Sequence, residues 1–139
     1  MSLDKIKILD SIKINHNKGD IFKIITKNDH GFDNFEEVYA SSVKYNQIKA
    51  WKLHKKMTLN LVVLIGSVKF VFYDNNQFSS YIIGEDNYKR IVVPPNIWFG
   101  FKGLSKSLNL VINVANLIHH DQEVVREDIN KFQYDWSVN

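Results

Sequence analysis

The hydrophobic pattern of the chain is strongest between residues 49 and 74. An apolar block, Leu59 to Ile65, is separated by Gly66 and Ser67 from a second run of strand-forming residues, Val68 to Tyr73. Two such runs around a glycine-containing turn predict a hairpin of two β-strands.

The segment before this hairpin mixes polar and apolar residues. Side chains alternate between the two faces of an extended strand, so Lys52 and His54 are expected on one face and Trp51 and Leu53 on the other. Continued in register, the first face would also carry Asn60. An imidazole and an amine would then project together beside an apolar surface, where their acid–base properties can be tuned.

Further strands are predicted where polar and apolar residues alternate, or where short apolar runs lie between turn residues. Pro94 and Pro95 end one of them, because proline cannot continue a ladder, and residues 96–105 are interpreted as a loop. Helical spacing is found only from residue 119 onward. The whole chain, residues 1–139, is expected to be one all-β domain, an antiparallel β-sandwich or barrel, with strands over residues 5–14, 21–26, 35–43, 78–83, 88–93 and 108–115.

Composition supports an ordered globular protein, with 45% hydrophobic and 13% aromatic residues. No run approaches the ~18 apolar residues of a membrane span, and the charged first residues do not resemble a secretory leader. The chain has no cysteine. We therefore expect a soluble, cytoplasmic protein that acts without a membrane.

The net charge of +3 is mild, and the basic residues cluster only at Lys52 to Lys56. A nucleic-acid-binding protein would more often show a basic stripe and a recognisable motif, whereas a few clustered cations suit a small anionic ligand such as a diphosphate. No phosphate-binding loop, dinucleotide fingerprint or nucleophile elbow is present. No second histidine lies two residues from His54, so we expect neither a bound metal nor another cofactor.

His54 is the first candidate for chemistry, as a general base or as a structural, hydrogen-bonded histidine. Lys52 would lower the pKa of His54 by like-charge repulsion and could steady a developing enolate, or it could be an ordinary surface lysine. Trp98, with Phe99 and Phe101, could line the mouth of a pocket or pack in the core.

His119 and His120 offer further acid or base groups. Adjacent residues of a strand point in opposite directions, so at most one of them faces a given pocket. Asp128 could orient a histidine or be a solvated surface charge.

These motifs resemble the cupin-type enzymes that act on dTDP-4-keto-6-deoxy sugars, namely the 3,5-epimerases and the 3,4-ketoisomerases. The ketoisomerases carry an Arg-Gly-x-His-x-His-Lys segment before a strand, a glycine turn and a second strand, and residues 49–55 correspond to it. A later Pro-Pro-x-x-Trp signal corresponds to residues 94–98. The closing acidic residue, arginine and phenylalanine correspond to Glu123, Arg126 and Phe132.

The chain departs from this family at three places. Lys52 replaces the first histidine of the paired-histidine segment, and Lys49 replaces the substrate-binding arginine. The tyrosine of the epimerases would fall near residues 117–118, where none is present. His54 matches the second histidine.

The resemblance implies a cupin-like jelly roll and a nucleotide-diphosphate sugar as ligand. By this analogy His54 would remove a proton beside the ketone, Lys52 would stabilise the enolate, and His119 or His120 would return the proton. The resemblance also implies a homodimer that exchanges N-terminal strands, residues 5–26. A non-catalytic nucleotide-sugar-binding cupin and an unrelated structural β-domain remain alternatives. The residues expected to contact substrate are Tyr39, Lys49, Trp51, Asn60, Trp98, Lys102 and Arg126.

Overall fold

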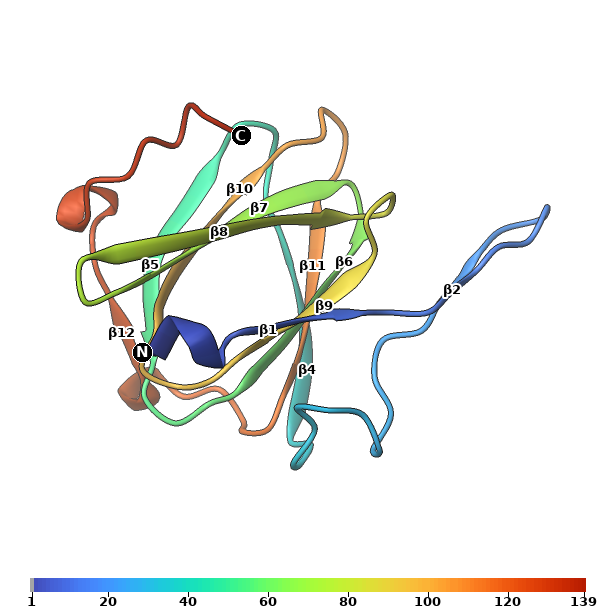
Figure 1. The fold of residues 1–139 in the computed structure, drawn as a ribbon, viewed down its shortest axis with the longest axis horizontal. Coiled ribbons are helices and arrows are strands. Elements are labelled where there is room, and N and C mark those ends of the chain that lie inside the picture. The colour runs from blue at the N-terminus through green and yellow to red at the C-terminus, as the bar shows by residue number, and fades with distance from the viewer. Residues whose placement is uncertain (1) are drawn as a thin grey trace.

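The computed structural model describes residues 2–139 as a two-layer β-sandwich (Figure 1). Helical structure in these residues is limited to the 3₁₀ turns η1 (Ser2–Lys5), η2 (Asp121–Glu123) and η3 (Ile129–Lys131). The expected all-β class is therefore confirmed. The strands are β1 (Lys7–Asp10), β2 (Lys13–Ile14), β3 (Ile21–Phe22), β4 (Glu37–Ser42), β5 (Ile48–His54), β6 (Leu59–Ile65), β7 (Ser67–Asp74), β8 (Gln77–Gly84), β9 (Lys89–Val93), β10 (Trp98–Gly103), β11 (Leu110–Ala115) and β12 (Val124–Arg126).

Two five-stranded antiparallel sheets form the layers, with strand orders β1-β9-β6-β11-β4 and β12-β5-β10-β7-β8. Their inner faces meet in one apolar core to which both sheets contribute, for example Leu61 and Ile91 from the first and Phe70 and Phe72 from the second. Burial of such side chains stabilises each by about 1.5–3 kcal/mol. This core fixes the positions of the strands that carry the polar residues described below.

The predicted hairpin of β6 and β7 is wrong in its pairing, although both strands exist. β6 pairs with β9 and β11, whereas β7 pairs with β8 and β10, so the two strands lie in different sheets. Gly66 has a φ of 82° and turns the chain from one sheet to the other, with the Leu108 carbonyl where a β-carbon would stand. A tight turn between apolar runs does not reveal whether the next strand pairs or crosses, because both runs are buried on two faces.

The segment predicted as a loop, residues 96–105, contains β10, which lies between β5 and β7 in the centre of its sheet. Two glycines in this segment are typical of a loop. Gly100 instead allows close packing, because a β-carbon there would lie 2.5 Å from the Ala50 side chain.

The helix expected after residue 119 is also absent. The segment forms η2 and then β12, which adds an edge strand to β5 through Val124–His54, Val125–Leu53 and Arg126–Lys52. The helical pattern consists only of Val125, Ile129 and Phe132. Three apolar residues are too few to distinguish a helix from a strand with irregular flanks.

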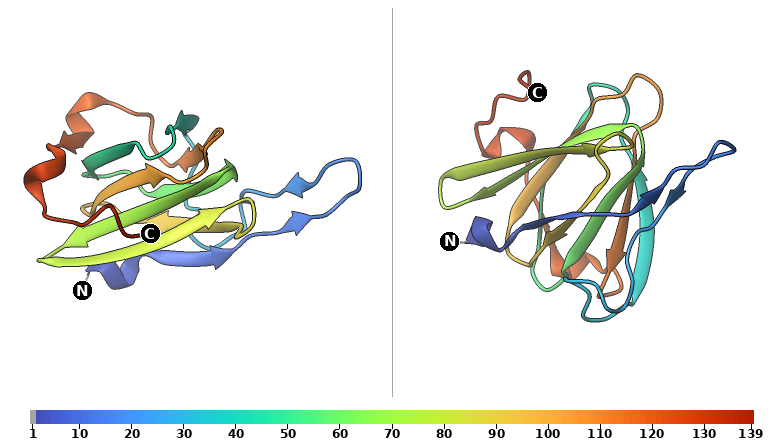
Figure 2. Two further views of the ribbon diagram at one scale, coloured as in Figure 1. Left: turned by 90° about the horizontal axis from the view of Figure 1, so that it is seen from above. Right: turned by 45° about the vertical axis from the view of Figure 1, so that its right-hand side comes forward.

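The N-terminal strands are shorter than predicted, and β2 and β3 form a narrow hairpin that projects from the body (Figure 2). At the other end of the chain, residues 127–138 cross the outer face of the β5-containing sheet and pack Phe132, Tyr134 and Trp136 onto it. Within the described residues 2–139, no helix is long and apolar enough to cross a membrane.

Candidate active site

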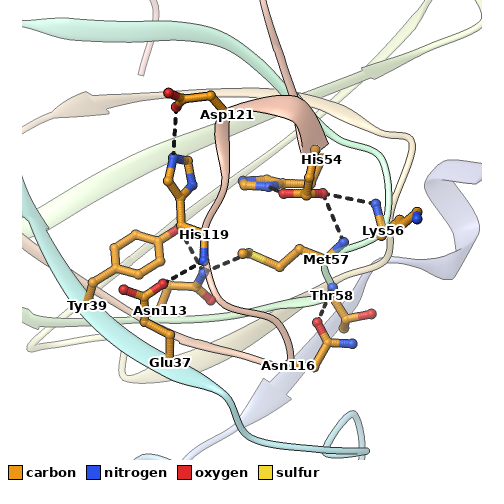
Figure 3. Close-up of polar contacts among 11 residues, drawn as sticks. Glu37, Tyr39, His54, Lys56, Met57, Thr58, Asn113, Asn116, His119 and Asp121 are labelled. Carbon is orange, nitrogen blue, oxygen red and sulfur yellow. Dashed lines mark hydrogen bonds and ion pairs between the residues drawn. The ribbon is translucent and has the colours of Figure 1, made fainter.

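The polar centre of the molecule is an imidazole–carboxylate pair between β5 and η2 (Figure 3). His54 is 2% exposed, and its Nδ1 lies 2.5 Å from Oε1 of Glu123. The second carboxylate oxygen, Oε2, accepts hydrogen bonds from the main-chain N–H groups of Lys56 (3.0 Å) and Met57 (3.2 Å). The turn after β5 therefore holds the carboxylate, and the carboxylate holds the imidazole.

These contacts favour one tautomer of His54. Glu123 meets three donors; burial acts to raise its pKa, but the His54 hydrogen bond and the two main-chain N–H groups outweigh burial and lower it. As a carboxylate it accepts a hydrogen bond from the Nδ1–H group, which leaves the lone pair of a neutral imidazole on Nε2. Burial lowers the pKa of His54, with Glu123 opposing and Lys52 assisting. Nε2 is buried without a hydrogen-bond partner among the described residues.

An aromatic wall adjoins the His54 ring. Phe99 of β10 stacks on it at 6.0 Å between centroids and 18° between planes. Across the sandwich, Tyr39 of β4 accepts a hydrogen bond from Asn113 Nδ2 (3.1 Å), and burial raises the pKa of its phenol. Phe99 lines a small pocket of about 40 Å³ together with Tyr39, Lys52 and Asn113. The same ring also lines a larger cavity of about 370 Å³.

Three cations converge on the larger cavity: Lys49, Lys52 and Arg126. Lys49 donates to the Ser42 carbonyl (2.7 Å). Lys52 and Arg126 are register partners on β5 and β12. Burial lowers the pKa of Lys52, and the charges of Arg126 and Lys49 lower it further, while Glu123 opposes them. Glu127 also lines this cavity, but the three cations outnumber it, and this excess of positive charge suits a phosphorylated ligand.

The expected alternation along β5 is confirmed: Lys52 and His54 face the interior, whereas Trp51 packs in the aromatic cluster of the outer face. Trp51 donates its Nε1–H to the Ile129 carbonyl (3.0 Å), although its edge also lines the larger cavity. Trp98 is likewise on the outer face, 5.4 Å from Phe132 between ring centroids.

Two other residues expected to contact substrate lie away from His54. Lys102 is on the outer face and donates to the Trp136 carbonyl (2.7 Å). Asn60 lies on β6, which belongs to the other sheet, so the expectation that it shares a face with Lys52 and His54 is wrong. Its side chain contacts Arg90 and donates to the Gly31 carbonyl (3.1 Å) on the far face of that sheet.

The further acid–base candidates separate from one another. His119 is half-buried near His54, and its Nε2 lies 3.5 Å from Asp121. His120 is exposed and lines a different surface cavity of about 660 Å³, beside Lys55 and Lys56. Asp128 is exposed and caps η3 by accepting a hydrogen bond from the Asn130 N–H (2.9 Å). Among residues 2–139 it has no hydrogen bond or ion pair with a histidine.

The residue that sequence reasoning assigned no role at the site is Glu123. It lies 69 positions from His54, and no local spacing connects the two. Its place in the closing acidic–arginine–phenylalanine pattern was the available signal. Among the described residues 2–139, no group of three or more histidine, aspartate and glutamate side chains is arranged to hold a metal ion.

The sequence matches a known family and a curated relative. Residues 4–135 match the sequence family described as FdtA: WxcM-like, C-terminal. A curated relative, the probable low-salt glycan biosynthesis epimerase Agl13 of Haloferax volcanii, is 28% identical over 115 residues, 74% of either chain.

Solved structures agree with the sandwich. A dTDP sugar isomerase from Desulfovibrio desulfuricans G20 superposes with a TM-score of 0.91 at 25% identity, covering 98% of this chain and 93% of that one. The sugar 3,4-ketoisomerase QdtA from Thermoanaerobacterium thermosaccharolyticum, in complex with TDP, gives 0.78 at 19% identity, covering 90% of each chain. The second likeness supports the cupin-like fold alone. The chain belongs to the FdtA family (WxcM-like, C-terminal), within the cupin-type dTDP-sugar epimerase and isomerase superfamily that its motifs resemble.

Proposed function

We propose that this chain is a nucleotide-sugar isomerase or epimerase, which transfers a proton next to the ketone of a dTDP-4-keto-6-deoxy hexose during the synthesis of surface-polysaccharide sugars. One observation carries the proposal: a buried imidazole whose Nδ1 is held by a carboxylate while its Nε2 has no partner. A buried polar atom rarely lacks a hydrogen-bond partner, and a catalytic role is one of the established reasons for such an exception. The family and the glycan-epimerase relative support the substrate class.

The chemistry follows from the tautomer. A 4-keto group acidifies the C–H bonds at C3 and C5 of the sugar, and Nε2 of neutral His54 accepts one of these protons. The carboxylate of Glu123 then faces an imidazolium, which it stabilises more than it stabilises the neutral ring. A positioned base of this kind contributes about 10²–10⁴ in rate. Because Phe99 stacks on the ring and forms the adjacent cavity wall, its side chain has to turn when the sugar enters.

The surrounding cations bind and polarise the substrate. Lys49 and Arg126 hold the diphosphate in the larger cavity, and Lys52, between them and His54, faces the developing enolate oxygen. Tyr39 provides an aromatic ring on the opposite wall. His119 is the nearer of the two histidine candidates for returning a proton.

The test is solvent deuterium uptake. The parent protein is expected to exchange the proton beside the ketone of a 4-keto sugar nucleotide in heavy water, and His54→Asn to abolish this exchange while still binding dTDP. Proton NMR measures the exchange and calorimetry the binding. Unchanged exchange in His54→Asn would remove His54 as the base. Binding by the parent with no exchange would select the non-catalytic alternative, which the replacement of the family's first histidine by Lys52 favours.

We also propose that the chain is a homodimer joined through the β2–β3 hairpin. Ile12, Ile14 and Ile21 are 62%, 46% and 57% exposed on this projecting element, an unfavourable arrangement unless a second copy covers it. The paired substitution Ile14→Asp and Ile21→Asp is expected to convert a dimer into a monomer in light scattering. A parent protein that is already monomeric would contradict this.

A further inference from the structure

Lys52, which is half-buried, differs in what its amine contacts from the buried Lys69 and Lys102 and from the exposed Lys49. Lys69 and Lys102 donate to main-chain carbonyls of the C-terminal segment, and Lys49 donates to the Ser42 carbonyl. Within the described residues 2–139, the Lys52 amine has no hydrogen bond or ion pair. It lines both the small pocket and the larger cavity, so it faces the place where a ligand would enter.

The charges that act on Lys52 come from β5, β12 and η2. Arg126 on β12 and Lys49 on β5 repel a proton on the amine, and Glu123 of η2 attracts one. His54, on the same strand, Tyr39, on the opposite wall, and Glu127, which also lines the larger cavity, are further titratable neighbours. Burial and the two cations outweigh the carboxylate, so the pKa of Lys52 is lowered. A desolvated lysine beside other cations is the usual setting of an amine nucleophile, because only the neutral amine carries a lone pair.

We propose that Lys52 is a nucleophile that forms a Schiff base with the ketone of the sugar. The inference rests on the proposed function, since it needs a keto sugar in the cavity. It gives Lys52 a role that neither a histidine nor an arginine at this position could fill.

The steps balance with water as the co-reactant. The neutral amine attacks C4, and one proton moves from the nitrogen to the former carbonyl oxygen. A second proton comes from solvent, the oxygen leaves as water, and a protonated imine remains. This cation acidifies the neighbouring C–H bond more strongly than the ketone does. Nε2 of His54 takes that proton, and the electron pair of the C–H bond forms an enamine. Return of the proton to carbon and addition of water regenerate the ketone and the free amine.

The experiment is reductive trapping. The parent protein is incubated with a dTDP-4-keto-6-deoxy hexose and cyanoborohydride, which reduces imines in preference to ketones. Intact mass is expected to rise by the mass of the sugar nucleotide less one oxygen, and peptide mapping to place the adduct on Lys52. Lys52→Arg is expected to bind dTDP but to lose both adduct and deuterium exchange, whereas Lys106→Arg, an exposed substitution, retains both.

The outcomes separate this inference from the proposed function. His54→Asn is expected to keep the adduct and lose the exchange, because imine formation does not require that base. Deuterium exchange by the parent without any adduct, an adduct on Lys49 instead, or an active Lys52→Arg variant would overturn the Schiff base and leave the proton-transfer function standing. Absence of both exchange and product in the parent would overturn the proposed function itself.

Discussion

Replacement of Glu123 by glutamine tests the geometry of the imidazole–carboxylate pair. In the parent, Oε2 accepts two main-chain N–H groups while Oε1 faces Nδ1 of His54. The glutamine side chain has one oxygen and one NH₂ group. The two N–H donors are fixed by the turn at Lys56 and Met57, so they retain the oxygen and the NH₂ group must face the imidazole.

The consequence is a change of tautomer. An NH₂ donor facing Nδ1 makes Nδ1 an acceptor and moves the ring proton to Nε2, so no lone pair remains to take the proton from carbon. Loss of a positioned base costs about 10²–10⁴ in rate, which corresponds to about 3–5 kcal/mol at 1.36 kcal/mol per decade. Because Glu123 acts through His54, kcat should fall while dTDP binding stays unchanged.

The assay is deuterium uptake beside the ketone, followed by proton NMR across a pH series, with dTDP affinity measured separately. Glu123→Asp is the matched variant: it keeps the charge but is one methylene shorter, so a partial loss is expected. A Glu123→Gln variant that exchanges at a rate within about tenfold of the parent would refute the tautomer argument, because loss of a general base lowers the rate by about 10²–10⁴. A fall in dTDP affinity equal to the fall in rate would instead indicate a binding role.

Three other measurements follow from the same structure. Burial lowers the pKa of His54, so kcat/KM should stay constant as the pH falls below the ordinary histidine pKa of about 6.5. It should decline only at the lowered pKa, where imidazolium forms. A pH–rate profile measures this, and a decline that begins above about pH 6.5 would contradict it. Arg126→Ala should weaken dTDP binding by about 10–150-fold, since a charge-assisted hydrogen bond contributes about 1.5–3 kcal/mol, and calorimetry measures it against Lys106→Ala. Lys102→Met should lower the free energy of unfolding in urea by about 1–3 kcal/mol, because it leaves the buried Trp136 carbonyl unpaired; a variant as stable as Lys106→Met would show that this contact contributes little.

The strands of this domain were predictable because their apolar runs are short and bounded by turn residues. The alternation of Lys52 and His54 against Trp51 was predictable too, since it requires only that β5 be extended. The pairing of the strands was not predictable from the sequence. The sequence between β6 and β7 has the composition of a hairpin turn, and only long-range packing assigns the two strands to different sheets.

The site was predictable only where its residues lie close together in the sequence. Residues close in sequence on β5 were found together, and Arg126 joined them through its place in the family pattern. Glu123 was overlooked because a contact across 69 positions leaves no periodic trace. Trp98 and Lys102 lie on the outer face because residues 98–103 form β10 instead of the predicted loop, and a strand sends neighbouring side chains to opposite faces. Phe99 faces the core of the sandwich, and Trp98 faces the aromatic cluster.

The C-terminal segment explains why this edge of the sandwich can carry chemistry. Residues 121–126 supply both the carboxylate that orients His54 and the cation beside Lys52, yet β12 is a three-residue edge strand with few ladder bonds of its own. The residues that follow compensate on the opposite face, where Lys69 and Lys102, only 3% and 7% exposed, donate to the carbonyls of Val138 and Trp136. A buried ammonium is unfavourable unless it is hydrogen-bonded, so each lysine favours the docked tail over the detached one. The docked tail restrains the chain directly after β12, so we expect these contacts on the far side of the sheet to limit fraying of β12 and, with it, movement of Glu123 away from His54.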